Sequence, residues 1–283
     1  MELDIYQKIW EVDMQNNGVL PILPDDTRDV SKGYVVVDHE IQSPEHRVLK
    51  DVHIPEGKRR SYRMVEKLFD NYTLNQYSRE KDTRKEFSEV KAFLTTIIQS
   101  PPIQLARGFV EGKLNKPFND LQWFTYLQQL WFRKFDLENG RDISGFEHVF
   151  VGEQKRKLLL GHHFWYKYWL EENGKLNHLH IDQIEMKDNL SYAAEPGAPY
   201  IMTAGYRLKA FDTENKQFVK VSKSRCGFFI GTSPEGLLAL GTIRALFPED
   251  APHYISFNGT SYKLEMYMSP DGKSIRTFYP YRE

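Results

Sequence analysis

The stretch Ser144-Gly-Phe-Glu-His-Val-Phe-Val-Gly-Glu153 decides the fold, because the character of the chain changes around it. Before residue 140 the apolar residues recur mainly at helical spacing, and after it short β-rich runs take over. We therefore predict an α+β protein, with a helical N-terminal lobe packed on a C-terminal lobe of antiparallel β-sheets. The two lobes are expected to span residues 1–140 and 141–283 and to form one domain together.

Helices are expected mainly in the first lobe. Tyr62, Val65 and Leu68 fall on one helical face. Thr83 and Glu86 have the spacing of a capping box ahead of a helix that the Pro101-Pro102 pair is expected to end. The regular apolar residues after Leu121 predict a further helix, whereas residues 18–58 look extended and rich in loops.

The second lobe is expected to hold strands and one helix. That helix spans roughly 234–246, with Thr232 or Ser233 as its N-cap. A hairpin should close the chain, pairing 262–268 with 274–279 across a Pro-Asp-Gly-Lys turn. Further strands are predicted over 163–171, 199–211, 217–222 and 227–231.

Composition narrows the function classes. The chain has 283 residues, 40% of them hydrophobic, and a formal net charge of -1, so it is not a strongly basic nucleic-acid binder. Any RNA contact must come from a local patch. The single cysteine, Cys226, excludes an intramolecular disulfide and a cysteine-based metal site. The chain begins without an apolar signal segment, so we expect a cytoplasmic protein, or a secreted one if a signal peptide has been removed.

Three groups of residues could carry chemistry: Glu147-His148, the run Gly161-His-His-Phe-Trp165, and the lysines Lys220 and Lys223. RNA cleavage without a metal needs a base for the ribose 2′-hydroxyl, an acid for the departing 5′-oxygen and a cation for the transition state. Histidine suits the first two roles because its pKa of about 6.5 lies near neutrality. Taken singly, each histidine is more simply explained as a core residue, and each lysine as a solvated charge.

Other signals have two interpretations each. The start of the helix at Thr232-Ser233 could donate N–H groups to a phosphate, or it could be a plain helix cap. The basic run Lys155-Arg-Lys157 is as well explained by a solvated turn as by a phosphate contact. For His178-x-His180-x-Asp182 a polar strand face is favoured over a metal site. A nucleophilic role for Cys226 is disfavoured, because it would need a partner base.

The motifs as a set resemble the EndoU family of poly(U)-specific endoribonucleases. The stretch 144–153 is similar to the family signature, and Gly161-x-His163-x-Trp165 to its second histidine motif. Phe229-Ile-Gly-Thr-Ser-Pro-Glu235 resembles the third block, and Ile9-Trp10-Glu-Val-Asp13 with Asn16 the opening of the domain. A hairpin over 259–280 follows the same outline, so the resemblance covers nearly the whole chain in the expected order.

The resemblance implies a catalytic lobe over 141–283 and the catalytic triad His148, His163 and Lys223. By analogy, His163 is the base and His148 the acid, although the reverse order stays open. The family comparison also implies supporting roles for Glu147, Glu153 and His162, with the two carboxylates orienting the histidines. Substrate contacts are implied for Tyr267, which would pack on the uracil or the ribose, and for Thr232, Ser233 and Gly227.

Several positions depart from the family pattern, namely His162, Phe164, Gly227, Gly236 and Met266, and two of them concern the expected site directly. His162 stands where an aromatic residue is usual, and if the doublet lay in a strand only one of its histidines could line the site. Gly227 stands where the family usually has a serine implicated in reading uracil, which leaves the base preference open.

The resemblance implies an endoribonuclease that cleaves single-stranded RNA at uridines. Attack by the 2′-hydroxyl would leave a 2′,3′-cyclic phosphate and a 5′-hydroxyl. Many family members respond to Mn²⁺, so a stimulatory ion without a tightly bound metal is expected. We expect a monomer with no membrane contact and no disulfide-linked partner. The alternatives are a non-catalytic RNA-binding protein that keeps the fold, and a toxin or regulator with a protein partner.

Overall fold

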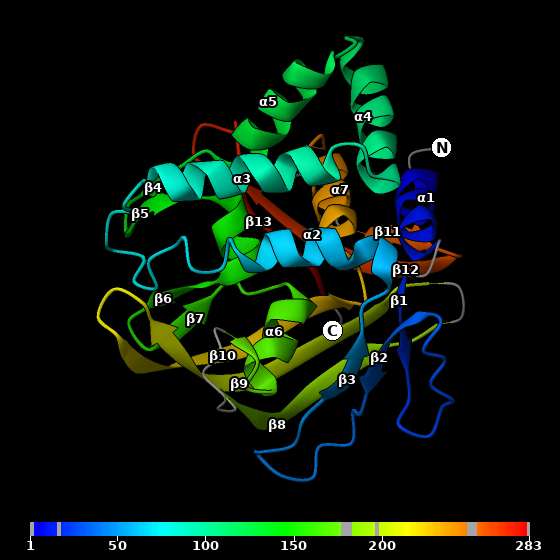
Figure 1. Cartoon of the computed structure of the whole chain (residues 1–283), viewed down its shortest axis with the longest axis vertical. Helices are drawn as coiled ribbons and strands as arrows, with labels where there is room; N and C mark the ends of the chain where they lie inside the picture. The colour runs from blue at the N-terminus through cyan, green and yellow to red at the C-terminus, as the bar shows by residue number, and fades with distance from the viewer. Residues whose placement is uncertain (1–2, 16–17, 177–182, 196–197, 248–253, 282–283) are drawn as a thin grey trace.

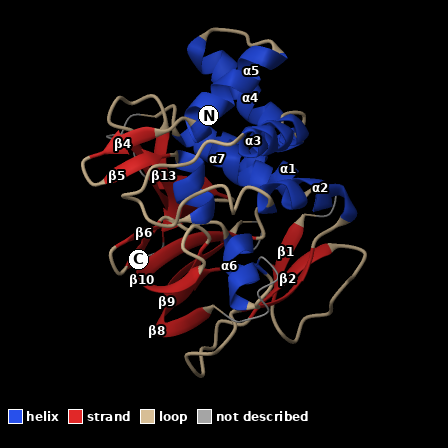
Figure 2. Ribbon diagram, turned by 60° about the vertical axis from the view of Figure 1, so that its left-hand side comes forward, coloured by secondary structure: helices blue, strands red, loops and turns tan. Residues whose placement is uncertain are grey.

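The computed structural model describes residues 3–15, 18–176, 183–195, 198–247 and 254–281. Helices gather in one half of the molecule and the long strands in the other, as Figures 1 and 2 show. The α+β fold class predicted from the sequence is therefore confirmed. The division at residue 140 stays a prediction, because buried residues from both sides of it belong to one continuous hydrophobic core.

The helical half follows the local signals closely. Its helices are α1 (Leu3–Met14), α2 (Glu56–Glu66), α3 (Arg84–Ile97), α4 (Pro101–Leu114) and α5 (Asp120–Phe132). The expected capping box is present, since the Thr83 hydroxyl accepts a hydrogen bond from the Glu86 amide at 3.2 Å. Pro101 follows the end of α3, as expected. It also opens α4, because proline is well tolerated in a first helical turn, and this helix was not predicted.

The extended stretch of the first half forms a small sheet of its own. Strands β1 (Val19–Ile22), β2 (Gly33–Val37) and β3 (Leu49–His53) pair in that order, with β1 and β2 parallel. A two-stranded hairpin, β4 (Phe135–Leu137) and β5 (Gly140–Ile143), leads into the second half.

The main sheet has the strand order β6-β7-β10-β9-β8. Its members are β6 (Glu153–Lys155), β7 (Leu158–Leu160), β8 (Ile184–Ala193), β9 (Tyr200–Asp212) and β10 (Gln217–Ile230). The strands predicted over 217–222 and 227–231 are one strand, β10, with a bulge between Lys223 and Cys226. A bulge rotates the side chains on either side of it, which matters below for the lysine.

The end of the chain matches its prediction. Helix α7 (Pro234–Arg244) is capped by Ser233, whose hydroxyl accepts a hydrogen bond from the Gly236 amide at 3.1 Å. Strands β11 (Tyr254–Phe257), β12 (Thr260–Met268) and β13 (Ile275–Tyr281) form an antiparallel sheet, and β12 and β13 make the expected hairpin. This sheet packs against the end of β10, where Phe229 contacts the rings of Phe257 and Phe278.

The strand predicted over 163–171 is wrong, because this segment forms helix α6 (Trp165–Glu172). All eight of its residues are buried, so no polar face reveals a helical period in the sequence. Its aromatic residues are also typical of strands, which biased the expectation. The helix lies on the inner face of the main sheet, where Tyr168 contacts the rings of Tyr206 and Phe228.

Candidate active site

His148 lies in a single wide π-helical turn, η1 (Glu147–Val151). The turn starts with a reciprocal cap in which the Ser144 and Glu147 side chains each accept the other's backbone amide at 3.2 Å. It ends where the Gly152 amide donates to the Glu147 carbonyl at 2.8 Å. The chain then turns into β6, which brings Glu153 Oε1 to 2.6 Å from His148 Nδ1.

His163 is held beside this turn by backbone hydrogen bonds. The amides of His162 and His163 donate to the carbonyls of His148 and Val149, at 2.8 and 2.7 Å. Gly161 has a φ of +62°, and a Cβ at this position would overlap the His148 carbonyl. The two histidine motifs are therefore joined directly, with ring centroids of His148 and His163 6.1 Å apart.

The surroundings of His163 favour a neutral ring whose Nε2 has no hydrogen-bond partner among the described residues. Its Nδ1 is 3.1 Å from the Gly227 carbonyl, which can only accept, so Nδ1 carries the proton. The ring stacks on Tyr279 with centroids 4.2 Å apart and planes 7° apart. Burial lowers the pKa of His163 well below its ordinary value, and the charges of Lys223 and His148 lower it further. This is the state that a general base requires.

Lys223 completes the cluster. It lies at the β10 bulge, and its Nζ donates to the Gly161 carbonyl at 2.7 Å. Lys220 lies three residues earlier, directly across from Lys209, and is exposed. The structure thus brings together His148, His163 and Lys223, the three residues implied by the family resemblance. Their catalytic roles stay predictions at this point.

His162 belongs to the core and not to the open site. Its side chain is fully buried, with Nδ1 2.6 Å from the Tyr206 hydroxyl and Nε2 2.6 Å from Glu171 Oε2. Glu171 also pairs with the buried Lys167. Only one histidine of the doublet reaches the site, but the reason is a loop in which His162 has a φ of +67°, not the alternation of a strand.

The two carboxylates of the first motif, Glu147 and Glu153, differ in their contacts. Glu153 contacts His148 directly, as expected. Glu147 instead caps its own turn through Ser144, so the predicted orienting role does not match its contacts. Burial, together with the nearby Glu153 charge, raises the pKa of Glu147 well above its ordinary value. Glu147 is thus a buried structural carboxyl.

Thr232 and Ser233 are also structural, which corrects the expected substrate contact. Both are buried, and the Ser233 amide donates to Asp13 Oδ2 at 2.9 Å. The Ser233 hydroxyl also contacts Asp13 in α1 and caps α7. The Ser233 amide and hydroxyl therefore stabilise the packing of α1 against α7 and are not open to a phosphate.

Gly227 is a glycine for a steric reason. A Cβ at this position would overlap the carbonyl of Pro280 in β13, so no serine fits without a shift of the backbone. Tyr267, expected to contact the base, is 47% exposed on β12 and pairs with Thr277. It shares a face of this sheet with Tyr279, its diagonal neighbour. Its substrate contact stays a prediction.

Tyr279 is the site residue that sequence reasoning missed. The hairpin was predicted, but nothing in its pattern showed which tyrosine would meet a histidine from another motif. Burial raises the pKa of Tyr279 to about 12, so its hydroxyl stays protonated near neutrality.

Cys226 touches the site without the properties of a nucleophile. Its thiol donates to the His162 carbonyl at 3.1 Å and lies 3.4 Å from His163 Nδ1. Burial raises the pKa of the thiol, which disfavours a thiolate.

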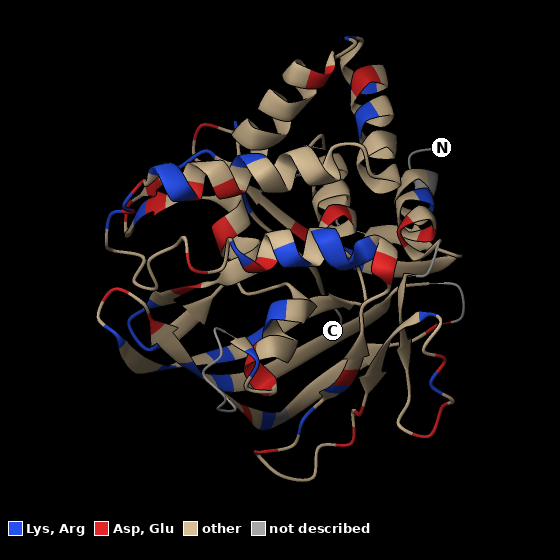
Figure 3. Ribbon diagram, in the orientation of Figure 1, with Lys and Arg blue, Asp and Glu red and all other residues tan. Residues whose placement is uncertain are grey.

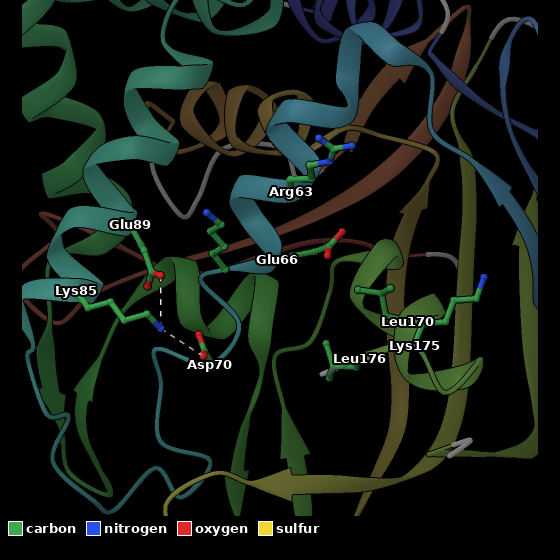
Figure 4. Close-up of a pocket in the computed structure, with 9 residues that line it drawn as sticks. Arg63, Glu66, Asp70, Lys85, Glu89, Leu170, Lys175 and Leu176 are labelled. Atoms are coloured by element: carbon green, nitrogen blue, oxygen red, sulfur yellow. Dashed lines mark ion pairs between the residues drawn. The ribbon is translucent and has the colours of Figure 1, made fainter. Parts of the chain in front are cut away.

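The other candidate features give less support for a functional site. His178, His180 and Asp182 lie outside the described residues. Within the described part of the chain, no three histidine, cysteine or carboxylate side chains form a group suited to a metal ion. None of the helices described there is long and apolar enough to cross a membrane. A cavity of about 420 Å³ between α2, α3 and α6 is lined by none of the three catalytic candidates (Figure 4). Lys85 pairs there with Asp70 and Glu89.

A buried neutral histidine, a carboxylate-bound histidine and a lysine lie together here, and these are the groups that acid–base cleavage of a phosphodiester requires. Comparison with known proteins agrees: residues 3–280 match the family model described as Endoribonuclease XendoU. The chain belongs to this family, which confirms the resemblance seen in the motifs.

Individual relatives support the same assignment. The chain is 30% identical over 300 residues to uridylate-specific endoribonuclease C of Danio rerio, covering 98% of this chain and 86% of the relative. It is 28% identical over 216 residues to poly(U)-specific endoribonuclease-B of Xenopus laevis, covering 75% and 69%. A solved structure described as XendoU, a splicing independent snoRNA processing endoribonuclease, has a TM-score of 0.70 at 22% identity. That alignment covers 99% of this chain and 96% of the other, and shows the shared fold.

Proposed function

We propose that this protein is an endoribonuclease that cleaves single-stranded RNA on the 3′ side of uridines, leaving a 2′,3′-cyclic phosphate and a 5′-hydroxyl. The observation that carries the proposal is the contrast between two neighbouring histidines. His163 is buried and neutral with Nε2 free, whereas His148 is bound through Nδ1 to a carboxylate. Family membership supports RNA as the substrate.

The chemistry follows from these two environments. Nε2 of His163 takes the proton from the 2′-hydroxyl, and the 2′-oxygen forms a bond to the adjacent phosphorus. The bond from phosphorus to the 5′-oxygen breaks, and His148 Nε2 gives a proton to that oxygen. Glu153 keeps Nδ1 of His148 protonated by accepting its hydrogen bond, so Nε2 is the nitrogen that exchanges protons. Each proton transfer is typically worth ~10²–10⁴ in rate.

Lys223 supplies the positive charge for the transition state. Its Nζ is fixed at the Gly161 carbonyl, next to the histidine doublet, and its charge acts on His163. A preorganised donor of this kind contributes ~10²–10³ in rate in comparable sites.

The uridine preference rests on the relatives named uridylate-specific and on the tyrosines of β12 and β13. Tyr279 and Tyr267 share a face on which a base could stack. Gly227 offers no side chain for reading the base, so we propose that its backbone contributes any hydrogen bond there.

The role of Mn²⁺ is proposed from the family resemblance. We propose that Mn²⁺ stimulates cleavage through the RNA, because the described residues offer no cluster of ligands for it. A cytoplasmic, monomeric enzyme is likewise proposed; Cys226 is buried against the site and so is unsuited to a disulfide-linked partner.

The test uses an oligonucleotide with a single uridine and its 2′-deoxyuridine counterpart, each with EDTA or Mn²⁺. We expect cleavage of the ribose substrate alone. Cleavage of both would exclude attack by the 2′-hydroxyl. Binding of both without cleavage would favour the alternative, a non-catalytic RNA-binding protein. Loss of activity in His163→Ala would identify the reacting histidine of the doublet.

A further inference from the structure

The outer face of the main sheet, opposite α6, carries a row of cations. Lys220 lies across from Lys209 and Ser222 across from Arg207 in the pairing of β10 with β9. Residues directly opposite in an antiparallel pair point to the same side, and alternate residues point to the other. The intervening Val221 and Leu208 are buried toward α6, so the basic side chains face away from the core. Figure 3 shows basic segments along these strands.

This face is open and weakly neutralised. The Arg207 side chain is 64% exposed, and Glu185 in β8, its carboxylate partner, lies 4.0 Å away. Lys220 is exposed, and Lys209 and Lys187 are half-buried. A local excess of cations stands out in a chain whose net charge is -1, and an anionic ligand would be attracted to it.

An aromatic pair continues the same face. Phe218 lies across from Phe211, one row beyond Lys220 and Lys209, with ring centroids 5.2 Å apart. Phe218 is 42% exposed. Cations followed by an accessible ring are the combination with which proteins bind single-stranded nucleic acid, because phosphates pair with the former and bases stack on the latter.

One end of this face adjoins the backbone of Lys223. The Lys187 ammonium donates to the Ser222 hydroxyl at 2.6 Å and to the Lys223 carbonyl at 3.0 Å. Lys223 turns its own ammonium to Gly161, beside the histidines. From Ser222 to Phe218 the strand covers roughly 13 Å at about 3.3 Å per residue, enough to accompany more than one nucleotide.

We propose that the basic face, defined by Lys187, Arg207, Lys209, Lys220 and Phe218, binds single-stranded RNA that flanks the cleaved nucleotide. The proposal rests on the endoribonuclease function proposed above and extends it from the scissile phosphate to the neighbouring chain. Phosphates pair with the cations, and a base stacks on Phe218. The open phenylalanine favours RNA over an acidic protein partner, which would need only the charges.

The experiment compares a trinucleotide and a 15-nucleotide RNA that share one central uridine. The test variants are the double variant Arg207→Gln/Lys220→Gln and the single variant Phe218→Ala. The control is Arg60→Gln/Lys91→Gln, which removes the same two charges from exposed positions on α2 and α3. KM and kcat are measured for both substrates, and binding of a labelled 15-nucleotide strand with 2′-deoxyuridine is followed by fluorescence anisotropy against salt.

The double variant loses two phosphate contacts. The slope of the logarithm of its RNA-binding constant against the logarithm of the salt concentration should therefore fall by about 1.4, since each contact contributes roughly 0.7 for single strands. At about 0.15 M salt this corresponds to a rise of about tenfold in KM for the long RNA. Phe218→Ala should raise it about fivefold or more. The trinucleotide and the control variant should be unaffected.

Three results would overturn the proposal: unchanged KM for the long RNA, an equal loss on the trinucleotide, or an equal effect of the control. Equally strong competition by polyglutamate of the same charge would overturn the choice of RNA. If the unaltered protein cleaves neither RNA, the proposed function fails, and the anisotropy comparison still decides whether this face binds the strand.

Discussion

Replacing Lys223 with glutamine removes a cation that the structure fixes next to the histidine doublet, where its charge acts on His163. Its Nζ donates to the Gly161 carbonyl at 2.7 Å. A unit charge about 4 Å from the developing phosphorane charge is worth up to about 4 kcal/mol at an effective dielectric constant of about 20. Because about 1.4 kcal/mol is tenfold in rate, the ceiling is about a thousandfold. We expect kcat to fall ~10²–10³-fold, as for other preorganised donors.

The same variant should change the pH profile in a defined direction. Burial is the main cause of the lowered pKa of His163, and the Lys223 charge is the next. Removing that charge raises the pKa, so the base becomes protonated at a higher pH. The acidic limb of the profile of kcat/KM against pH reports groups of the free enzyme, and it should therefore shift to higher pH.

The assay is cleavage of the uridine trinucleotide from about pH 4 to pH 9, with thermal unfolding to confirm that the variant is folded. Lys91→Gln on α3 serves as the control for loss of a lysine. A loss of kcat below about fivefold, or an acidic limb that stays in place or moves downward, would refute this account of Lys223.

Three further predictions concern neighbouring positions. Glu153→Gln should lower the single-turnover rate constant for cleavage about tenfold or more, because Glu153 contacts His148. Glu147→Gln, at a buried carboxyl with a raised pKa, should change this rate constant by less than about threefold. Equal losses in the two variants would contradict this distinction. Gly161→Ala should lower the Tm in a thermal melt, because φ is positive and the new Cβ meets the His148 carbonyl; an unchanged Tm would argue against this packing. Tyr279→Ala should raise KM and lower kcat while Tyr279→Phe retains the stack on His163, and equal effects would point to the hydroxyl instead.

Several elements of this protein could be predicted from its sequence, because they depend on local interactions. The Thr83 capping box, the Ser233 cap and the terminal hairpin each depend on residues a few positions apart, and each is present. The ordered motifs likewise indicated the family and brought out His148, His163 and Lys223 before any geometry was known.

What the tertiary structure decided depends on contacts between distant segments. Gly161 meets the His148 carbonyl, Gly227 meets Pro280, and His163 stacks on Tyr279, more than a hundred residues away in the sequence. Burial on all sides concealed the helical period of α6. Local sequence sets the preferences of single turns and strands, but which side chains face one another, and which become buried and lose their charge, is determined only when the sheets and helices pack.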